Sequence, residues 1–379
     1  MSASQASVCQ AFSRRSVLKG GALLGAMSLA ACGNPDETRP PPVAGGGSGE
    51  VVVRDGGGAW GDAQRKAFFA PFEKETGIKV VPAPSGGQPQ LRAAILSGKP
   101  GMDVADVGGG NIGAWEQEGL LQKIDYAKWK DPALRTQFMP FKSSEFRVPS
   151  IIFAVQLAFD ETVTGGPLQS WADLWDTKKF PGKRSMHPAD APGGGVYEIS
   201  LLADGVDPAK LYPLDMERAL RKLSQLKPDI LKFWGSGAES VQLIIDKQVS
   251  AVAAWNGRVD TAVSKGAKNV QSSWQQALLQ VDYWAIPKGA QNVPAAQQFI
   301  DFVIQPKAQA EFAKLITYAP TLPQAYNYIP EDRQKLLATA PQYKDKIIVF
   351  DPEFWATKNS EGKPMPEVAG DMWQKWLTS

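Results

Sequence analysis

The sequence predicts an α/β protein with two lobes and a mostly parallel sheet. Strand patterns alternate with helix patterns through most of the chain, which is the order of a parallel α/β sheet. After the first 49 positions about 330 residues remain, which is more than one hydrophobic core usually serves. A hydrophobic content of 43% supports a packed globular protein.

The N-terminus is predicted to be an export signal that lies outside the fold. Ser13-Arg14-Arg15-Ser16-Val17-Leu18-Lys19 matches the bacterial twin-arginine pattern. The stretch from Gly20 to Ala31 is shorter than the ~20 apolar residues of a membrane span. Leu29-Ala30-Ala31-Cys32 is similar to a lipoprotein cleavage box, in which Cys32 becomes the lipidated first residue. We therefore predict a signal peptide over 1–31 and a Pro/Gly-rich flexible tether over 32–49, with a basic core helix as the weaker alternative.

Sequence patterns predict the first strands and helices of the folded part. "EVVVRDGGGAW" predicts a strand and a glycine turn, then a helix that opens near Asp62 and ends by Gly77. Pro71 predicts a kink or a break in that helix. "IKVVPAP" is a second strand, and "QPQLRAAILSG" a helix with Pro89 in its first turn and Gly98 at its end. "MDVADVGGG" predicts a third strand that runs into glycines.

The alternation resumes in the second half of the chain. "FAVQLAFD" predicts a strand, and "LDMERALRKLSQL" a helix with Leu220, Leu223 and Leu226 on one face. "ESVQLIIDKQ" predicts a helix and "VSAVAAW" the next strand. "PAAQQFIDFVIQP" has helical spacing, and a further helix starts at Pro306. The sequence contains no internal repeat and no coiled-coil heptads.

The composition excludes several classes of function. A net charge of +2 is too small to favour nucleic acid or an anionic membrane as a partner. The two cysteines, Cys9 and Cys32, leave the predicted folded part without a thiol, and His187 is the only histidine. Cys/His and Ser/His/Asp catalysis and a His-rich zinc site are therefore excluded, and we expect no metal and no cofactor. Carboxylate or lysine chemistry stays open, but the balance favours binding.

Four glycine loops recur where strands pass into helices: Gly56–Gly58, Gly86–Gly87, Gly108–Gly110 and Gly193–Gly195. Ligands of open α/β sheets bind at the carboxyl ends of strands, where helix N-termini offer free N–H groups. Four such loops together favour a ligand cleft over simple tight turns. The G-x-G-x-x-G spacing that starts at Gly108 is not a dinucleotide fingerprint, because the helix that follows is too short, and the chain has no P-loop.

Several longer motifs together resemble one known family. They are "FEKETGIKV", "DVADVGGGNIGAWEQEGLLQKID", "SWADLWDTKKFPGK", "VAAWNGRV", "YWAIPKGAQNVPAAQQFIDFV" and "YAPTLPQAY". In order and spacing they resemble the solute-binding proteins of ABC importers, specifically the spermidine/putrescine-binding group, over nearly all of residues 50–379. The resemblance implies a type II periplasmic-binding-protein fold, with a ligand cleft between two lobes joined by crossover strands. Lobe 1 would comprise 50–157 and 283–332, and lobe 2 would comprise 158–282 and 333–379.

The resemblance also implies a set of ligand-binding residues. In the polyamine group, aromatic rings enclose the methylene chain and carboxylates bind the ammonium ends. Trp60, Trp255 and Tyr318 match the aromatic positions, and Asp190 and Asp282 match the acidic ones. We expect three further contacts, from Gly108, Gly109 and Ser236. The rings could instead be core residues, Asp282 a hinge cap or ion-pair partner, and Asp190 a turn residue.

The sequence also departs from the polyamine pattern. The loop Gly108–Asn111 carries no ring, although the family has a serine and tyrosines there, and the position of a second carboxylate falls on Gly193. The loss of one ammonium partner should cost ~1.5–3 kcal/mol. A smaller diamine, a zwitterion such as an aminophosphonate, a thiamine-like cation or another solute therefore remains open. Arg258 and His187 are expected to be structural or solvated.

The sequence thus predicts a monomeric, lipid-tethered periplasmic receptor. It would capture a polyamine such as putrescine or spermidine and deliver it to an ABC permease in the inner membrane, and it would not be an enzyme. The alternatives are an exported two-lobe enzyme that uses Asp190 and Asp282, and a structural envelope lipoprotein without a ligand. The sequence does not identify the ligand, its affinity, the partner permease or the membrane that holds the anchor.

Overall fold

A computed structural model describes residues 49–84 and 86–379. The predicted twin-arginine signal, the lipidation at Cys32 and the tether as far as Ser48 lie outside the described residues. Within the described ranges, no helix combines the length and the apolar character that a membrane span requires.

The fold begins with a parallel strand pair, β1 (Glu50–Asp55) and β2 (Lys79–Pro84). Between these strands lie α1 (Gly58–Gln64), a π-helical segment (Arg65–Phe69) and α2 (Ala70–Thr76). The helix starts four residues before Asp62, and it widens ahead of Pro71 without breaking. Gly77 ends it in the left-handed region at φ 73°, as the prediction placed it.

Short elements then lead to the centre of the molecule. They are α3 (Gln88–Leu96), β3 (Ala105–Gly108), α4 (Gly109–Gln117), β4 (Leu121–Gln122) and two 3₁₀ turns (Tyr126–Lys128 and Pro132–Thr136). Glycines precede both helices at the points that the sequence indicates.

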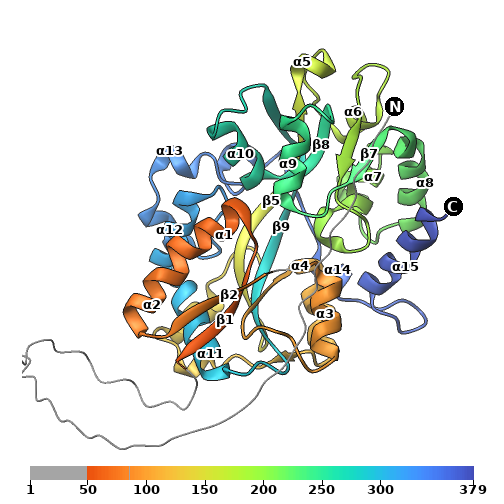
Figure 1. The fold of residues 1–379 in the computed structure, drawn as a ribbon. Helices are drawn as coiled ribbons and strands as arrows, with labels where there is room; N and C mark the ends of the chain where they lie inside the picture. The colour runs from red at the N-terminus through yellow and green to blue at the C-terminus, as the bar shows by residue number, and fades with distance from the viewer. Residues whose placement is uncertain (1–48, 85) are drawn as a thin grey trace, which may run out of the picture. The chain divides into compact units, whose positions relative to one another are not determined.

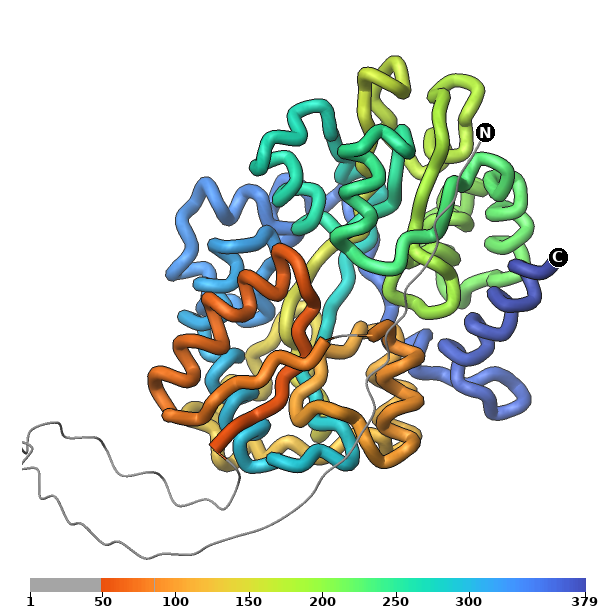
Figure 2. Tube along the Cα trace, in the orientation of Figure 1, coloured from red at the N-terminus to blue at the C-terminus, as the bar shows by residue number. Residues whose placement is uncertain are grey.

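Two long strands form the centre of the fold, β5 (Arg147–Asp160) and β9 (Val270–Pro287). They pair antiparallel along most of their length and run side by side in Figures 1 and 2. The prediction of a mostly parallel sheet is therefore wrong. The chain leaves the first lobe along β5 and returns along β9, so the return strand must run in the opposite direction. β3, β4 and β8 also pair antiparallel with these strands.

The segment between β5 and β9 carries most of the second lobe. Its elements are α5 (Glu161–Thr164), α6 (Trp171–Trp175), β6 (Arg184–Met186), α7 (Val196–Ala203), α8 (Met216–Leu226), β7 (Ile230–Phe233), α9 (Gly237–Ile245), β8 (Ala251–Trp255) and α10 (Asn256–Ser264). After β9 the chain forms α11 (Val293–Val303), α12 (Pro306–Leu315), α13 (Glu331–Gln334), β10 (Ile348–Val349), α14 (Pro352–Trp355) and α15 (Met365–Leu377). The larger sheet has the strand order β10-β9-β5-β8-β6-β7.

Separate hydrophobic clusters support the two lobes. One cluster contains Phe68 from the π-helical segment, Trp284 from β9, Phe299 from α11 and Phe312 from α12. Another contains Trp171, Tyr197, Leu223 and Trp373, and so joins α6, α7 and α8 to the C-terminal helix α15. The two-lobe fold is thus confirmed, while the exact residues at which each lobe begins and ends stay a prediction.

Candidate ligand-binding cleft

A cavity of about 330 Å³ lies where β1, β3, β8 and β9 meet the helices that follow them. This volume is in the range of ~300–1,000 Å³ that is usual for small-molecule sites. Seven of the predicted site residues line it: Trp60, Gly108, Asp190, Ser236, Trp255, Asp282 and Tyr318. The structure does not bring the eighth, Gly109, to the cavity. A Cβ atom at Gly109 would lie 2.8 Å from the Val281 carbonyl oxygen, so this glycine allows α4 to pack against β9.

Aromatic rings form much of the cavity wall. The Trp255 ring packs edge-on against Trp234, with the ring centroids 5.0 Å apart, and its Nε1 donates to the Gly193 carbonyl at 3.3 Å. Tyr318 is only 3% exposed and packs edge-on against Phe153 at 6.0 Å. These contacts hold the rings in one orientation, so their faces are available to a ligand without further ordering.

The third ring, Trp60, depends on a glycine. A Cβ atom at Gly56 would lie 1.9 Å from the Trp60 ring, which leaves room for no other residue at that position. The first glycine loop therefore brings its backbone directly against an aromatic face of the cleft.

Two carboxyl groups lie close together at the base of the cleft, one on the cavity wall and one buried outside the cavity lining. Asp282 on β9 lines the cavity, and Asp106 lies on the neighbouring strand β3, where Gly108 is the residue opposite Asp282. Burial raises the pKa of Asp282 to about 6. Burial and the nearby Asp282 raise the pKa of Asp106 well above its usual range. Ser150 Oγ donates to Asp106 Oδ1 at 2.8 Å.

Arg54 on β1 is the cation nearest to this pair. Its guanidinium donates to the backbone carbonyl of Asp106 and, at 3.1 Å, to the carbonyl of Gly86. Burial lowers the pKa of Arg54, although an arginine keeps its charge at neutral pH. The floor of the cleft therefore holds a buried positive charge beside the two carboxyls.

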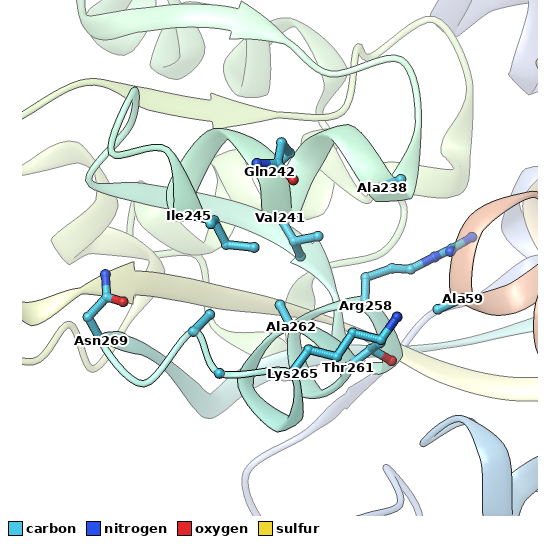
Figure 3. Close-up of a pocket in the computed structure, with 12 residues that line it drawn as sticks. Ala59, Ala238, Val241, Gln242, Ile245, Arg258, Thr261, Ala262, Lys265 and Asn269 are labelled. Atoms are coloured by element: carbon cyan, nitrogen blue, oxygen red, sulfur yellow. The ribbon is translucent and has the colours of Figure 1, made fainter.

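A second arginine joins the two sides of the cleft. Arg258, in the first turn of α10, donates to the carbonyl of Gly57 at 3.2 Å and to that of Gly56 at 3.3 Å. Figure 3 shows its guanidinium reaching from α10 toward the segment that carries Ala59. Arg258 is 4% exposed, so of the two expected roles, structural or solvated, the solvated one is wrong. Its Nε atom has no hydrogen-bond partner within the described part of the chain.

His187 also lines the cleft. Its Nδ1 lies 2.6 Å from the Pro188 carbonyl oxygen, a contact that places the ring proton on Nδ1. Burial lowers the pKa of His187, against the opposing effect of the Asp190 charge, so the ring is neutral at pH 7. The ring packs edge-on against Trp234 at 4.8 Å. The solvated alternative is therefore wrong for His187 as well.

Three helices begin at the cleft, α3 after Gly87, α4 after Gly108 and α9 after Ser236. The N-caps of α3 and α4 make no side-chain capping hydrogen bond, whereas Ser236 Oγ accepts from the Glu239 amide at 3.2 Å. The first amides of a helix carry partial positive charge and bind anions. The cleft therefore combines a carboxylate floor with backbone donors on its walls.

A second hollow of about 510 Å³ opens between α9 and α10 (Figure 3). Val241, Ile245, Ala262 and Lys265 contribute to its walls, and Arg258 lines both this hollow and the cleft. Over residues 49–84 and 86–379, no group of three or more His, Cys, Asp or Glu side chains is arranged to hold a metal ion.

Two lobes joined by long strands, with a cleft that offers rings, both signs of charge and helix N-termini, define a receptor for a small polar ligand. The family comparison agrees. Residues 67–345 match the bacterial extracellular solute-binding proteins, and the chain belongs to that family.

Relatives of known specificity give the context. The gamma-aminobutyric acid (GABA)-binding protein of Pseudomonas aeruginosa is 35% identical over 83% of this chain and 89% of its own length. The structure of the Atu4243 GABA receptor superposes with a TM-score of 0.73 at 33% identity, covering 86% of this chain and 97% of the receptor. Spermidine/putrescine-binding periplasmic protein 1 of Haemophilus influenzae is 27% identical over 72% of this chain and 76% of its own length.

This protein is thus the substrate-binding component of an ABC importer, which acts outside the cytoplasm with membrane permease subunits. The expectation that it is not an enzyme is confirmed, and the alternatives of an exported enzyme and of a structural lipoprotein are set aside.

The sequence reasoning missed four cleft-side residues as functional groups: Arg54, Asp106, His187 and Arg258. A signal existed for two of them. Arg54 and Asp106 are charged residues inside "EVVVRD" and "DVADV", which otherwise are apolar strands. A buried charge needs a partner, so a charge in each of two buried strands indicates that they meet.

Proposed function

We propose that the ligand is a small ω-amino acid of the GABA type, captured in the periplasm and delivered to the permease. One observation carries the proposal. Asp282, which is half-buried, and Arg258, which is buried, carry opposite charges and line the same cleft of about 330 Å³. A zwitterion would present an ammonium group to one and a carboxylate to the other.

The ammonium end would bind at the floor. Asp282 offers a half-buried carboxylate on the cavity wall, and hydrogen bonds between ionised partners are about twice as strong as neutral ones. Tyr318 and Trp255 are within the same cavity, and a ring face contributes ~0.5–2 kcal/mol to a cation placed over it. The aromatic residues predicted from the sequence would thus still contact the ligand, although the ligand's methylene chain is shorter than that of spermidine.

The carboxylate end would bind at Arg258 and the nearby helix N-termini. The unpartnered Nε of Arg258 is one donor, and α9 begins beside it, because a Cβ atom at Gly237 would lie 3.0 Å from that Nε. Arginine binds carboxylates through two parallel N–H groups, which makes this end selective for a planar anion.

A polyamine is the second candidate, supported by the presence of both Asp190 and Asp282 on the cavity wall. Arg54 and Arg258 oppose it, since two guanidinium groups line the cavity and would face a dication whose second ammonium has no carboxylate at Gly193. The 35% identity to a GABA-binding protein, against 27% to a spermidine/putrescine-binding protein, supports the amino acid.

Isothermal titration with GABA and with putrescine tests the choice, because the two ligands differ mainly in the charge at one end. Arg258→Gln should weaken GABA binding about ten- to a hundredfold, the loss of one charged hydrogen bond. The same change should leave putrescine binding unchanged or tighten it. Arg221→Gln removes an exposed positive charge on α8 and is the matched control.

Asp282→Asn should weaken the binding of either amine by a similar factor. Wild-type protein that binds putrescine more tightly than GABA, together with unchanged GABA affinity in Arg258→Gln, would overturn the amino-acid proposal and restore the polyamine. We also propose that the protein is exported by the twin-arginine pathway, is anchored through Cys32 and works as a monomer, as its sequence predicts.

A further inference from the structure

Asp106 has an unusual set of neighbours for a buried carboxyl group. Its side chain is fully buried and does not line the cavity, and it neighbours the Asp282 carboxyl across the pairing of β3 with β9. Ser150 Oγ donates to Asp106 Oδ1, whereas Oδ2 has no donor among the described residues. A carboxylate oxygen in this position would lose its hydration without replacement, which is costly.

The neighbouring strand β5 is shaped to supply the serine. Pro149 pairs with Tyr283 and Ile151 with Asp282, so Ser150 is the extra residue of a bulge. Bulges commonly redirect a side chain next to a functional site. Here the bulge directs the Ser150 hydroxyl to Asp106 and leaves Asp282 free to face the cavity.

Among residues 49–84 and 86–379, Arg54 is the cation that acts on both carboxyls, but it makes no hydrogen bond to the Asp106 side chain. Arg54 donates to the backbone carbonyl of Asp106, and its Nε has no partner within the described ranges. The groups that face Asp106 are thus Arg54 from β1, Ser150 from β5 and Asp282 from β9. Two ionised carboxylates side by side in this setting would repel each other, and one proton between them removes the repulsion.

We propose that Asp106 carries that proton and donates it in a hydrogen bond to Asp282, so that the pair presents one negative charge to one ammonium group. Asp106 is then a positioning residue: it fixes the Asp282 carboxylate and satisfies its own Oδ2. The proposal deepens the proposed function and rests on it for the ligand. The proposal predicts that Asp106 and Asp282 together bind the single ammonium group of an amino acid. They offer no second negative charge to the other ammonium group of a diamine.

The burial of Asp106 and the effect of Asp282, which together raise the pKa of Asp106, agree with a protonated acid at neutral pH. The two carboxyls titrate as a coupled pair, so the proton belongs to both, with Asp106 as its main position.

Three substitutions separate the roles of Asp106 and Asp282. In Asp106→Asn an amide N–H replaces the acid O–H, so GABA affinity by titration calorimetry should stay within about threefold of wild type. Asp282→Asn should lose about tenfold or more. Asp106→Leu, which has no donor, should lose affinity that Asp106→Asn retains. If Asp106→Asn weakens GABA as much as Asp282→Asn does, Asp106 is charged in the wild type and the proposal is overturned.

A measurement without ligand keeps this test separate from the choice of ligand. We expect infrared spectra of the protein at about pH 8 to contain a protonated-carboxyl band that Asp106→Asn removes. Glu198→Gln is the appropriate background, since Glu198 is also fully buried and burial raises its pKa to about 7. Absence of the band overturns the proposal. The band without GABA binding would overturn only the proposed ligand.

Discussion

The substitution Gly110→Ala tests whether the two sides of the cleft come into contact only when a ligand is bound. Gly110 lies in the first turn of α4, and a Cβ atom there would be 2.2 Å from the Cβ of Pro192 and 3.0 Å from Cζ of Phe350. Pro192 begins a 3₁₀ turn (Pro192–Gly194) on the opposite side of the cleft. Gly110→Ala therefore places a methyl group where the lobes meet, without a strained φ at position 110 itself.

The size of the effect follows from the overlap. Carbon atoms in contact approach to ~4 Å, so the two segments must separate by more than about 1 Å. Overpacking of this kind costs ~1–3 kcal/mol. If only the ligand-bound form brings the segments together, the whole cost falls on that form. The dissociation constant for GABA should then rise about 5- to 150-fold.

Titration calorimetry and ligand-free thermal unfolding together decide the outcome. We expect weaker binding with nearly unchanged unfolding of the free protein. Gly166→Ala is the control, because a Cβ atom at Gly166 meets no atom within 4 Å and Gly166 does not line the cavity. Equal affinity combined with a lower midpoint of unfolding in Gly110→Ala would refute the reasoning, since the contact would then exist in the free protein too.

Two further predictions concern stability and anchoring. Glu198 is fully buried and accepts hydrogen bonds from Tyr212 Oη and Trp355 Nε1, each at 3.0 Å, and burial raises its pKa to about 7. The folded state thus holds this proton more tightly than the unfolded state, and the unfolding free energy should fall as pH rises from about 4.5 through about 7. Glu198→Gln should flatten this fall in urea unfolding at a series of pH values, and parallel curves for both proteins would contradict it. Cys32→Ser should move the protein from the membrane to the soluble fraction on cell fractionation, and retention in the membrane fraction would argue against the anchor.

Local patterns in the sequence predicted most individual elements. The glycine that ends a helix at Gly77 and the proline that opens one at Pro306 act within a few residues, so the sequence around them is sufficient. The direction of strand pairing is different. β5 and β9 are more than a hundred residues apart, and their antiparallel pairing depends on the path of the chain through a whole lobe.

The residues of the site divide in the same way, into those that local sequence patterns indicate and those that meet only through long-range contacts. Trp255 ends β8 and Trp60 follows the first glycine turn, where turn chemistry and family motifs both point to a cleft, whereas Asp282 lies within β9 and is indicated by the family motif alone. The partnership of Asp106 with Asp282 joins β3 to β9, and Arg258 crosses the cleft to Gly57. No spacing within the chain encodes such contacts, because they arise only when distant strands come together.

The interruptions in the ladder between β5 and β9 bear on the order in which a solute is captured. The pairing shifts register after Pro149 and after Val155, and between these points the two strands carry Asp282 at the cavity floor. A ladder bends most readily where its hydrogen bonds are interrupted. Asp282 therefore lies between two points at which the strands are expected to bend, whereas Trp60 and Trp255 lie on the two lobes. Any motion of the lobes about these points would displace the two rings more than the carboxyl. The charge that recognises a solute would then keep its place while the rings close on the solute or withdraw from it, so that the rings would set how long the solute stays.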